Sequence, residues 1–181
     1  MKQLYSYLIF ILLIVPSVYA QDKGDVPWQK KADFKAEEGN ILEDILWLEE
    51  NPIATSTNDT KVMSEYVLNW LTHTPYLSVT FDEVFLEGLS NNKHYKFAEK
   101  FRITYLFGKS YYVITHQDAV EEAAASARGI RGMVKVYQEL KKVDPSVKNR
   151  ILEKYSRLVK SAKVEDYARL QLKKVAVDPY E

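Results

Sequence analysis

Three basic residues at helical spacing are the side chains of this sequence best suited to hold an anion. Arg128, Arg131 and Lys135 are spaced so that a helix would carry all of them on one face. An arginine guanidinium can donate two parallel hydrogen bonds to a carboxylate or a phosphate. The row is therefore an anion site, a solvated basic face, or a set of partners for acidic residues of the N-terminal half. The last two outcomes are the more common for such a row.

The histidines follow no pattern of metal ligands. His73, His94 and His116 come from three separate segments, and none belongs to a His-Glu-x-x-His or similar motif. His73 and His116 each fall near the predicted end of a helix, where positive charge interacts favourably with the helix dipole. We predict no metal site and no cofactor.

Motifs for hydrolysis and nucleotide binding are also missing from the sequence. There is no Gly-x-Ser-x-Gly elbow, phosphate-binding loop or dinucleotide fingerprint. Neighbouring acidic residues such as Glu49 and Glu50, or Glu121 and Glu122, point about 100° apart on a helix, which is typical of surface charge. A hydrolase whose acid and base come from distant carboxylates stays open as an alternative.

The first twenty residues have the layout of a signal peptide. Lys2 gives a positive start, Tyr7–Val15 is an unbroken apolar run, and Val18 and Ala20 occupy the small-residue positions of a cleavage site. An uncleaved N-terminal anchor is the alternative interpretation. No later segment has the roughly 20 apolar residues that a membrane-spanning helix needs. We predict cleavage near Ala20 and an exported product, periplasmic or secreted.

Composition limits how this chain can be stabilised. It has 181 residues, 46% of them hydrophobic, and no cysteine, so that a single packed core must serve without disulfides or thiolate metal sites. Residues 21–120 carry 16 acidic and 10 basic side chains, whereas residues 121–181 carry 9 and 14. Export and a net charge of zero argue against a nucleic-acid partner.

Hydrophobic periodicity predicts the elements that position these residues. The pattern indicates an all-α domain over residues 33–174, with six or seven antiparallel helices in one compact bundle or helix-pair stack and no sheet. Residues 21–32 are an irregular lead-in and residues 175–181 a frayed tail. The first predicted helix covers residues 33–50, and the second is capped at Thr57 or Asn58 and carries Val62 to Leu71. A short third helix runs from the capping box at Thr80–Glu83 to Leu89. The remaining predicted helices cover residues 93–116, 119–143, Pro145 to about Ser161, and 164–174.

The first and second of these predicted helices end in similar sequences. Residues 47–52 read Trp-Leu-Glu-Glu-Asn-Pro and residues 70–75 read Trp-Leu-Thr-His-Thr-Pro. We predict a helical hairpin anchored by Trp47 and Trp70 and packed on the more apolar helix that contains Phe97–Tyr112. That helix is apolar nearly all round, so we expect it at the centre of the fold. Small residues between Ala123 and Gly132 would let another helix approach closely.

The chain shows only a faint sign of repeats. Gly108, Tyr111 and Ala127 match part of the tetratricopeptide-repeat motif, but no second copy of the motif occurs about 34 residues away. Stacking of helix pairs as degenerate repeats stays open. The twin Trp-Leu endings, behind a signal peptide and ahead of an aromatic-rich helix, resemble small exported all-helical proteins of unknown function from Bacteroidetes-type bacteria. The resemblance covers about Trp47–Tyr112 and implies export and a helical fold, with no functional residues carried over.

Three functions remain compatible with these patterns. The leading hypothesis is a non-catalytic exported envelope protein that acts as a helical scaffold or binding module, with another envelope protein or envelope component as its partner. The alternatives are a small hydrolase acting on cell-wall or carbohydrate material, and a carrier whose Phe97–Tyr112 aromatics line a cavity for an apolar ligand. Convergence of Tyr112, His116, Arg128 and Arg131 on one concavity would favour a site at these residues.

Overall fold

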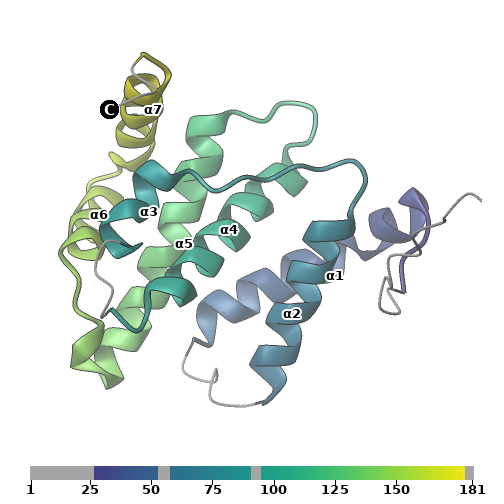
Figure 1. Ribbon diagram of the computed structural model, residues 1–181, viewed down its shortest axis with the longest axis horizontal. Coiled ribbons are helices and arrows are strands. Elements are labelled where there is room, and N and C mark those ends of the chain that lie inside the picture. The colour runs from purple at the N-terminus through teal and green to yellow at the C-terminus, as the bar shows by residue number, and fades with distance from the viewer. Residues whose placement is uncertain (1–26, 53–57, 91–94, 178–181) are drawn as a thin grey trace, which may run out of the picture.

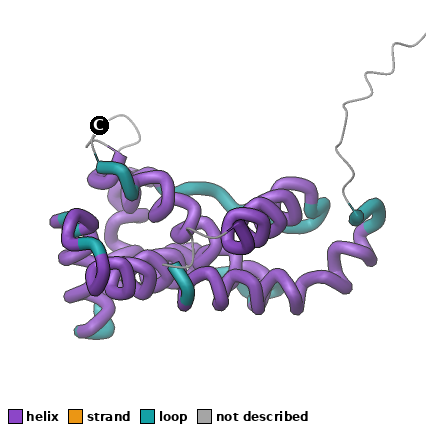
Figure 2. Tube along the Cα trace, turned by 90° about the horizontal axis from the view of Figure 1, so that it is seen from below, coloured by secondary structure: helices purple, strands orange, loops and turns teal. Residues whose placement is uncertain are grey.

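The structure is a computed structural model that describes residues 27–52, 58–90 and 95–177. Within these ranges the chain is all helical and has no strand, which confirms the predicted fold class (Figures 1 and 2). The elements are α1 (Lys31–Glu50), α2 (Asn58–His73), α3 (Glu83–Ser90), α4 (Ala98–Thr115), α5 (Glu122–Val143), the 3-10 turn η2 (Pro145–Val147), α6 (Arg150–Lys160) and α7 (Val164–Val177).

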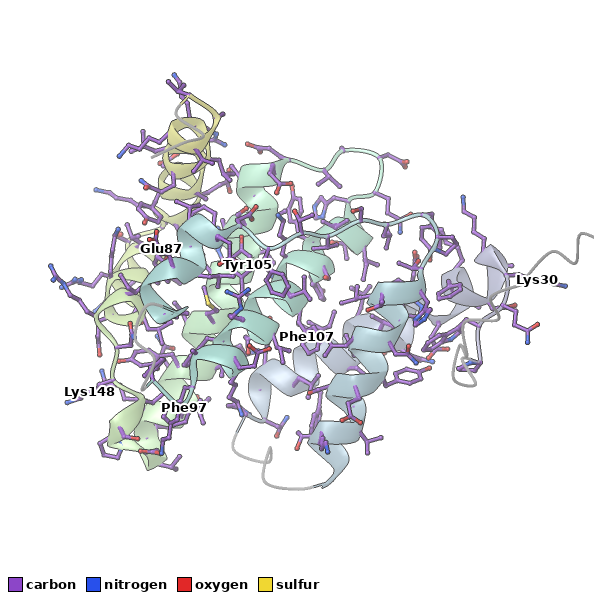
Figure 3. All side chains as sticks on the ribbon, in the orientation of Figure 1. Lys30, Glu87, Phe97, Tyr105, Phe107 and Lys148 are labelled. Carbon is purple, nitrogen blue, oxygen red and sulfur yellow. The ribbon has the colours of Figure 1, made fainter. Side chains whose placement is uncertain are left out.

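Helices α4 and α5 form the centre of the molecule. They pack against each other along their lengths, with α1 and α2 on one side and α3, α6 and α7 on the other (Figure 1). Each side has its own apolar core, and α4 contributes to both. Tyr105 lies on the α3 side of α4, whereas Phe107 lies on the α2 side (Figure 3). The predicted central helix is confirmed, and α5 shares that position.

The predicted anchoring of the α1–α2 hairpin is only half right. Trp70 is fully buried and lies 6.2 Å from Phe34, ring centre to ring centre. Trp47 is 37% exposed, so its predicted anchoring role is wrong. The reason is its place on the helix, since it falls beside the buried stripe of α1 and not on it. That stripe consists of Phe34, Ile41, Ile45 and Leu48.

A tryptophan of the predicted lead-in is part of the core shared by α1 and α2. Trp28 is only 7% exposed, and its ring centre lies 5.5 Å from that of Phe34 and 5.0 Å from that of Tyr66. The carboxylate of Asp33 accepts hydrogen bonds from the backbone N–H groups of Gln29 and Lys30, which fixes the entry into α1. The helix consequently begins at Lys31 and not at Asp33.

Glycines allow the two central helices to touch. A Cβ atom on Gly108 would lie 2.9 Å from both the carbonyl oxygen of Arg128 and the Cα of Gly129. A Cβ on Gly129 would in turn meet the ring and the carbonyl oxygen of Tyr105 at 2.8 Å. The predicted close approach at the small-residue stretch of α5 is confirmed, and the helix that approaches is α4.

Several helix boundaries differ from the predicted ones for local reasons. Helix α5 starts at Glu122 after a turn that contains Asp118, so Asp118 is not its cap.

Pro145 opens η2 instead of α6, because the Asp144 carboxylate caps that short turn at the Ser146 N–H. Helix α6 then starts at Arg150, where Asn149 accepts from the N–H of Ile151 at 2.8 Å. At the C-terminal end, α7 continues to Val177.

The start of α4 also differs, and some predictions fall outside the described ranges. Tyr95–Phe97 form a turn, and the helix starts at Ala98 and not at Lys93. The predicted signal peptide, its cleavage near Ala20, His94 and the last residues of the predicted tail lie outside the described residues.

Candidate functional site

A cavity of about 410 Å³ lies between α1, α2 and α4, with one residue of α5 in its wall. This volume is within the range of about 300 to 1,000 Å³ that is typical of small-molecule sites. Its lining residues are Leu48 and Glu49 of α1, Thr60, Lys61, Ser64, Glu65 and Leu68 of α2, Lys100, Ile103, Thr104 and Phe107 of α4, and Val136 of α5.

The cavity arises from the way α2 is rotated. This helix buries Val67 and Trp70 in the core that it shares with α1, and therefore turns its polar side toward α4. Short polar side chains such as Ser64 do not fill the space over the apolar surface of α4. Protein interiors are otherwise close-packed, so this unfilled region is a distinct feature of the fold.

The walls of the cavity are apolar at one end and mixed at the other. Lining residues recur one helical turn apart on both α2 and α4, which run in similar directions in Figure 1. Lys61 and Lys100 belong to the first turns of their helices, and Leu68 and Phe107 lie about two turns further on. A ligand in the cavity would have apolar contacts with the second pair and polar contacts with the first.

Lys100 is a cavity-lining residue whose pKa is lowered by burial. Its Nζ donates a hydrogen bond to the carbonyl oxygen of Pro52 at 3.0 Å. Burial lowers its pKa to about 8, because an apolar environment disfavours the charged ammonium. Lys100 therefore loses its proton at lower pH than an exposed lysine does.

Glu49 is a buried carboxylate at the cavity wall and forms an ion pair with Arg128. It is 2% exposed, and both of its oxygens accept hydrogen bonds from the Arg128 guanidinium, at 2.7 and 3.0 Å. That guanidinium also lies 4.7 Å from the ring centre of Tyr111. A Cβ on Gly132 would lie 2.5 Å from Glu49 Oε1, so glycine at 132 leaves room for the ion pair.

Two residues of the predicted basic row of α5 pair with carboxylates of α1. Arg128 pairs with Glu49, and Lys135 Nζ lies 2.8 Å from a carboxylate oxygen of Glu50, whereas Arg131 is exposed. For Arg128 and Lys135 this confirms the alternative in which the row pairs with the acidic N-terminal half, whereas the exposed Arg131 fits the solvated basic face. Among the lining residues of the cavity, Arg128, Arg131 and Lys135 do not occur.

The cavity is not lined by Tyr112, His116, Arg128 or Arg131. Tyr112 stacks on His116 with ring centres 4.0 Å apart, and His116 follows the last residue of α4. Neither residue lines the cavity, and neither do Arg128 and Arg131. Of the Phe97–Tyr112 aromatics only Phe107 does. The predicted aromatic lining is wrong, because Phe101 and Tyr105 point to the opposite core.

A second polar cluster is buried between the α2–α3 connection, α4 and α5. Lys109, 2% exposed, lies 2.8 Å from Asp82 Oδ2 and also donates to Glu122. The same Asp82 oxygen accepts from Ser126 Oγ at 2.8 Å and from the Tyr105 hydroxyl. Burial, together with the charge of Asp82, raises the pKa of Tyr105. None of these residues lines the cavity. The bonds of Asp82 to Lys109, Tyr105 and Ser126 join the α2–α3 connection to α4 and α5.

The histidines that the structure describes are helix-end residues, as predicted. His73 lies in the last turn of α2 and its Nδ1 is 2.9 Å from the carbonyl oxygen of Asn69. His116 Nδ1 is 3.0 Å from the carbonyl oxygen of Tyr112. Over residues 27–52, 58–90 and 95–177 no group of three or more histidine, aspartate or glutamate side chains is arranged to hold a metal ion.

Two carboxylates line the cavity, as a hydrolase would require, but each has a cation beside it. Glu49 is held by Arg128, and Glu65 Oε1 lies 3.8 Å from Lys61 Nζ one turn earlier on α2. A general acid and a general base must be able to exchange protons with a substrate. The two-point bond to Arg128 occupies both oxygens of Glu49, so this geometry does not favour the hydrolase alternative.

Comparison with protein-family models, curated proteins and solved structures gives no match to this chain. None of the helices in the described part of the chain is long and apolar enough to cross a membrane. The cavity is therefore the feature on which a functional proposal must rest.

Proposed function

We propose that this chain is an exported, non-catalytic helical binding protein whose cavity between α1, α2 and α4 takes a small, largely apolar component of the cell envelope. The observation that carries the proposal is a cavity of about 410 Å³ with Leu68, Ile103, Phe107 and Val136 in its walls. Burying apolar ligand surface there would contribute roughly 25 cal/mol per Å². The proposal combines the binding-module hypothesis with the apolar-carrier alternative.

Titration with an uncharged apolar dye tests the proposal. Nile red should bind saturably, one molecule per chain, with the blue shift and rise in fluorescence that accompany transfer to an apolar site. Ser64→Trp places an indole in the cavity and should abolish binding. Val62→Trp is the matched control, because Val62 is 54% exposed on the same helix and does not line the cavity. Equal binding by both variants would place the dye elsewhere and contradict the proposal.

The exported location is tested separately. It is supported by the charged start, apolar run and small residues of the first twenty positions. Expression of the full chain in a bacterial host, followed by intact-mass measurement on the periplasmic fraction, should give a product that begins at Gln21. A product that retains Met1 and sediments with the membranes would support the uncleaved anchor instead.

A further inference from the structure

Charge is divided between the two ends of the molecule. Helix α1 carries seven acidic and two basic side chains. The segment 148–177, which holds α6 and α7, carries nine basic and three acidic side chains, and residues 178–181 add two acidic ones. Helices α6 and α7 lie at the end of the molecule opposite to α1 and α2 (Figure 1). The fold therefore separates a negative end, formed by α1, from a positive end, formed by α6 and α7.

Most basic side chains of the positive end are exposed and have no ion pair within the described part of the chain. They are Arg150, Arg157, Lys160, Lys163, Lys173 and Lys174. The carboxylates of the same segment are paired with other cations. Glu153 pairs with Lys141, and both Glu165 and Asp166 pair with Arg169. The six cations repel one another, so a surface of negative charge outside the molecule would be a favourable neighbour for them.

Helix α6 carries its basic side chains on the side away from the core. Leu152 and Tyr155 are buried, whereas Arg150 and Arg157 are exposed. The two arginines are seven residues apart, which is about two turns or roughly 10 Å along a helix, so they leave the same side of α6. Lys160 follows about one turn later. Guanidinium groups in such a row can each bind a phosphate through two parallel hydrogen bonds.

Helix α7 adds apolar side chains to the positive end. Leu170 and Val177 are 52% and 76% exposed, lie two turns apart, and leave the side of the helix opposite the buried Ala168. Lys173 and Lys174 lie between them on that side, and the last five residues of α7 are all exposed. A helix face of this kind places its apolar side chains at the boundary between lipid headgroups and acyl chains, while the ammonium groups stay at the phosphates.

We propose that the positive end docks the protein on membrane surfaces that carry anionic phospholipids. The inference goes beyond the proposed function, because it concerns a different surface and does not need an occupied cavity. Charge alone would also suit an acidic protein or the negative end of a second copy. The exposed Leu170 and Val177 favour a lipid surface, where apolar acyl chains begin directly beneath the phosphates.

Vesicle flotation tests the inference. The mature chain from Gln21 to Glu181, which lacks the apolar run Tyr7–Val15, is mixed with vesicles of phosphatidylcholine alone or of equal parts phosphatidylcholine and phosphatidylglycerol. Binding to the anionic vesicles should be at least about tenfold stronger, and high salt should abolish it. Equal binding to both kinds of vesicle, or binding to neither, would overturn the inference. Nile red binding to the free protein is measured separately, so the two proposals fail independently.

Paired charge variants locate the contact on the molecule. The double variant Arg157→Gln, Lys160→Gln should bind anionic vesicles about 25-fold more weakly, because each basic residue near such a surface contributes about fivefold. The control Lys31→Gln, Arg131→Gln makes the same change in net charge at exposed residues of α1 and α5, and should lose less than about threefold. All four residues are exposed, so both variants should melt like the parent. Equal weakening by the two variants would overturn docking through the positive end.

A fluorescent probe separates a lipid surface from the other partners. Anionic lipids with brominated acyl chains should quench the added fluorescence of Val177→Trp on α7 and leave that of Val62→Trp on α2 unchanged. Quenching at position 62 and not at position 177 would place the membrane contact at the wrong end. Salt-sensitive oligomers that form without any vesicle binding would assign the positive end to a second copy, and would also overturn the inference.

Discussion

Lys100 is a half-buried lysine whose pKa is lowered by its surroundings. Lys100 has its pKa lowered to about 8 by burial, so between about pH 8 and 10.5 the unfolded chain binds a proton that the folded chain does not. The burial of this charge therefore opposes folding fully below pH 8, and the opposition disappears as the pH rises toward 10.5.

Replacement of Lys100 by an uncharged side chain should consequently stabilise the fold in a pH-dependent way. Lys100→Met should raise the free energy of unfolding by about 1 kcal/mol at pH 7, after allowance for partial exposure, and the gain should shrink as the pH rises to 10.5. Urea unfolding at pH 7 and at pH 10 measures this difference. A gain that grows with pH would have the wrong sign for a lysine with a lowered pKa.

The tryptophans of α1 and α2 give a second test at the scale of single residues. Trp70 is fully buried, so Trp70→Ala should cost roughly 3 to 5 kcal/mol through lost burial and the cavity left behind. Trp47→Ala makes the same chemical change at a residue that is 37% exposed, and should cost less than about 1.5 kcal/mol. Chemical denaturation of both variants checks the ranking. Equal losses would contradict the observed packing of the hairpin.

At the scale of elements, the contact between α4 and α5 depends on two glycines. Gly108 faces the backbone of α5, which cannot move aside as a flexible side chain can. Gly108→Ala should cost about 1 to 3 kcal/mol, because the helices must separate to admit a methyl group. Gly39→Ala is the matched control in the exposed middle of α1, where a Cβ would meet nothing within 4 Å. It should stabilise by about 0.5 to 1 kcal/mol, so thermal melting should move in opposite directions for the two variants.

Hydrophobic periodicity predicted the helices well, but it did not predict the contacts and the cavity between them. The apolar stripes gave seven helices close to the observed ones, since a buried helical face leaves a regular pattern in the sequence. Trp47 was misplaced because one residue of rotation moves a side chain about 100° around the helix. The charged residue Lys109, between Phe107 and Tyr112 of the central helix, was a signal of a buried polar cluster, because a buried charge requires partners.

The cavity residues were not found in advance for a different reason. Thr60, Lys61, Ser64 and Glu65 form an ordinary polar face of α2, and nothing local in the sequence says that this face covers part of α4. The bond between Glu49 and Arg128 likewise joins residues 79 positions apart. Tertiary arrangement alone turns these residues into a cavity wall and an ion pair.

At the scale of the whole molecule, two carboxylates of the acidic half of the chain pair with two cations of the basic half. Glu49 and Glu50 at the end of α1 bond to Arg128 and Lys135 of α5. The bridges Lys96–Asp144 and Arg102–Glu83 do not follow this division, because Lys96, Arg102 and Glu83 all belong to residues 21–120. Part of the charge asymmetry of the sequence is thus pairing between α1 and α5.

Replacement of Arg128 tests how much its ion pair with Glu49 contributes to stability. Arg128→Met leaves Glu49 buried without its partner, and should cost about 3 to 5 kcal/mol. Arg131→Met makes the same change at an exposed residue of the same helix, and should stay within about 0.5 kcal/mol. The difference in unfolding free energy between the two variants is the readout. A loss at Arg131 as large as that at Arg128 would show that the pair with Glu49 is not what holds α1 to α5.

The location of a bound apolar molecule tests the central claim most directly. In a methyl-labelled sample saturated with Nile red, intermolecular nuclear Overhauser effects should connect the dye to the methyl groups of Leu68, Ile103 and Val136, which line the cavity. The methyl groups of Leu170 and Val177, exposed on α7, should show none. Contacts to Leu170 and Val177 with none to Ile103 and Val136 would contradict a binding site between α1, α2 and α4.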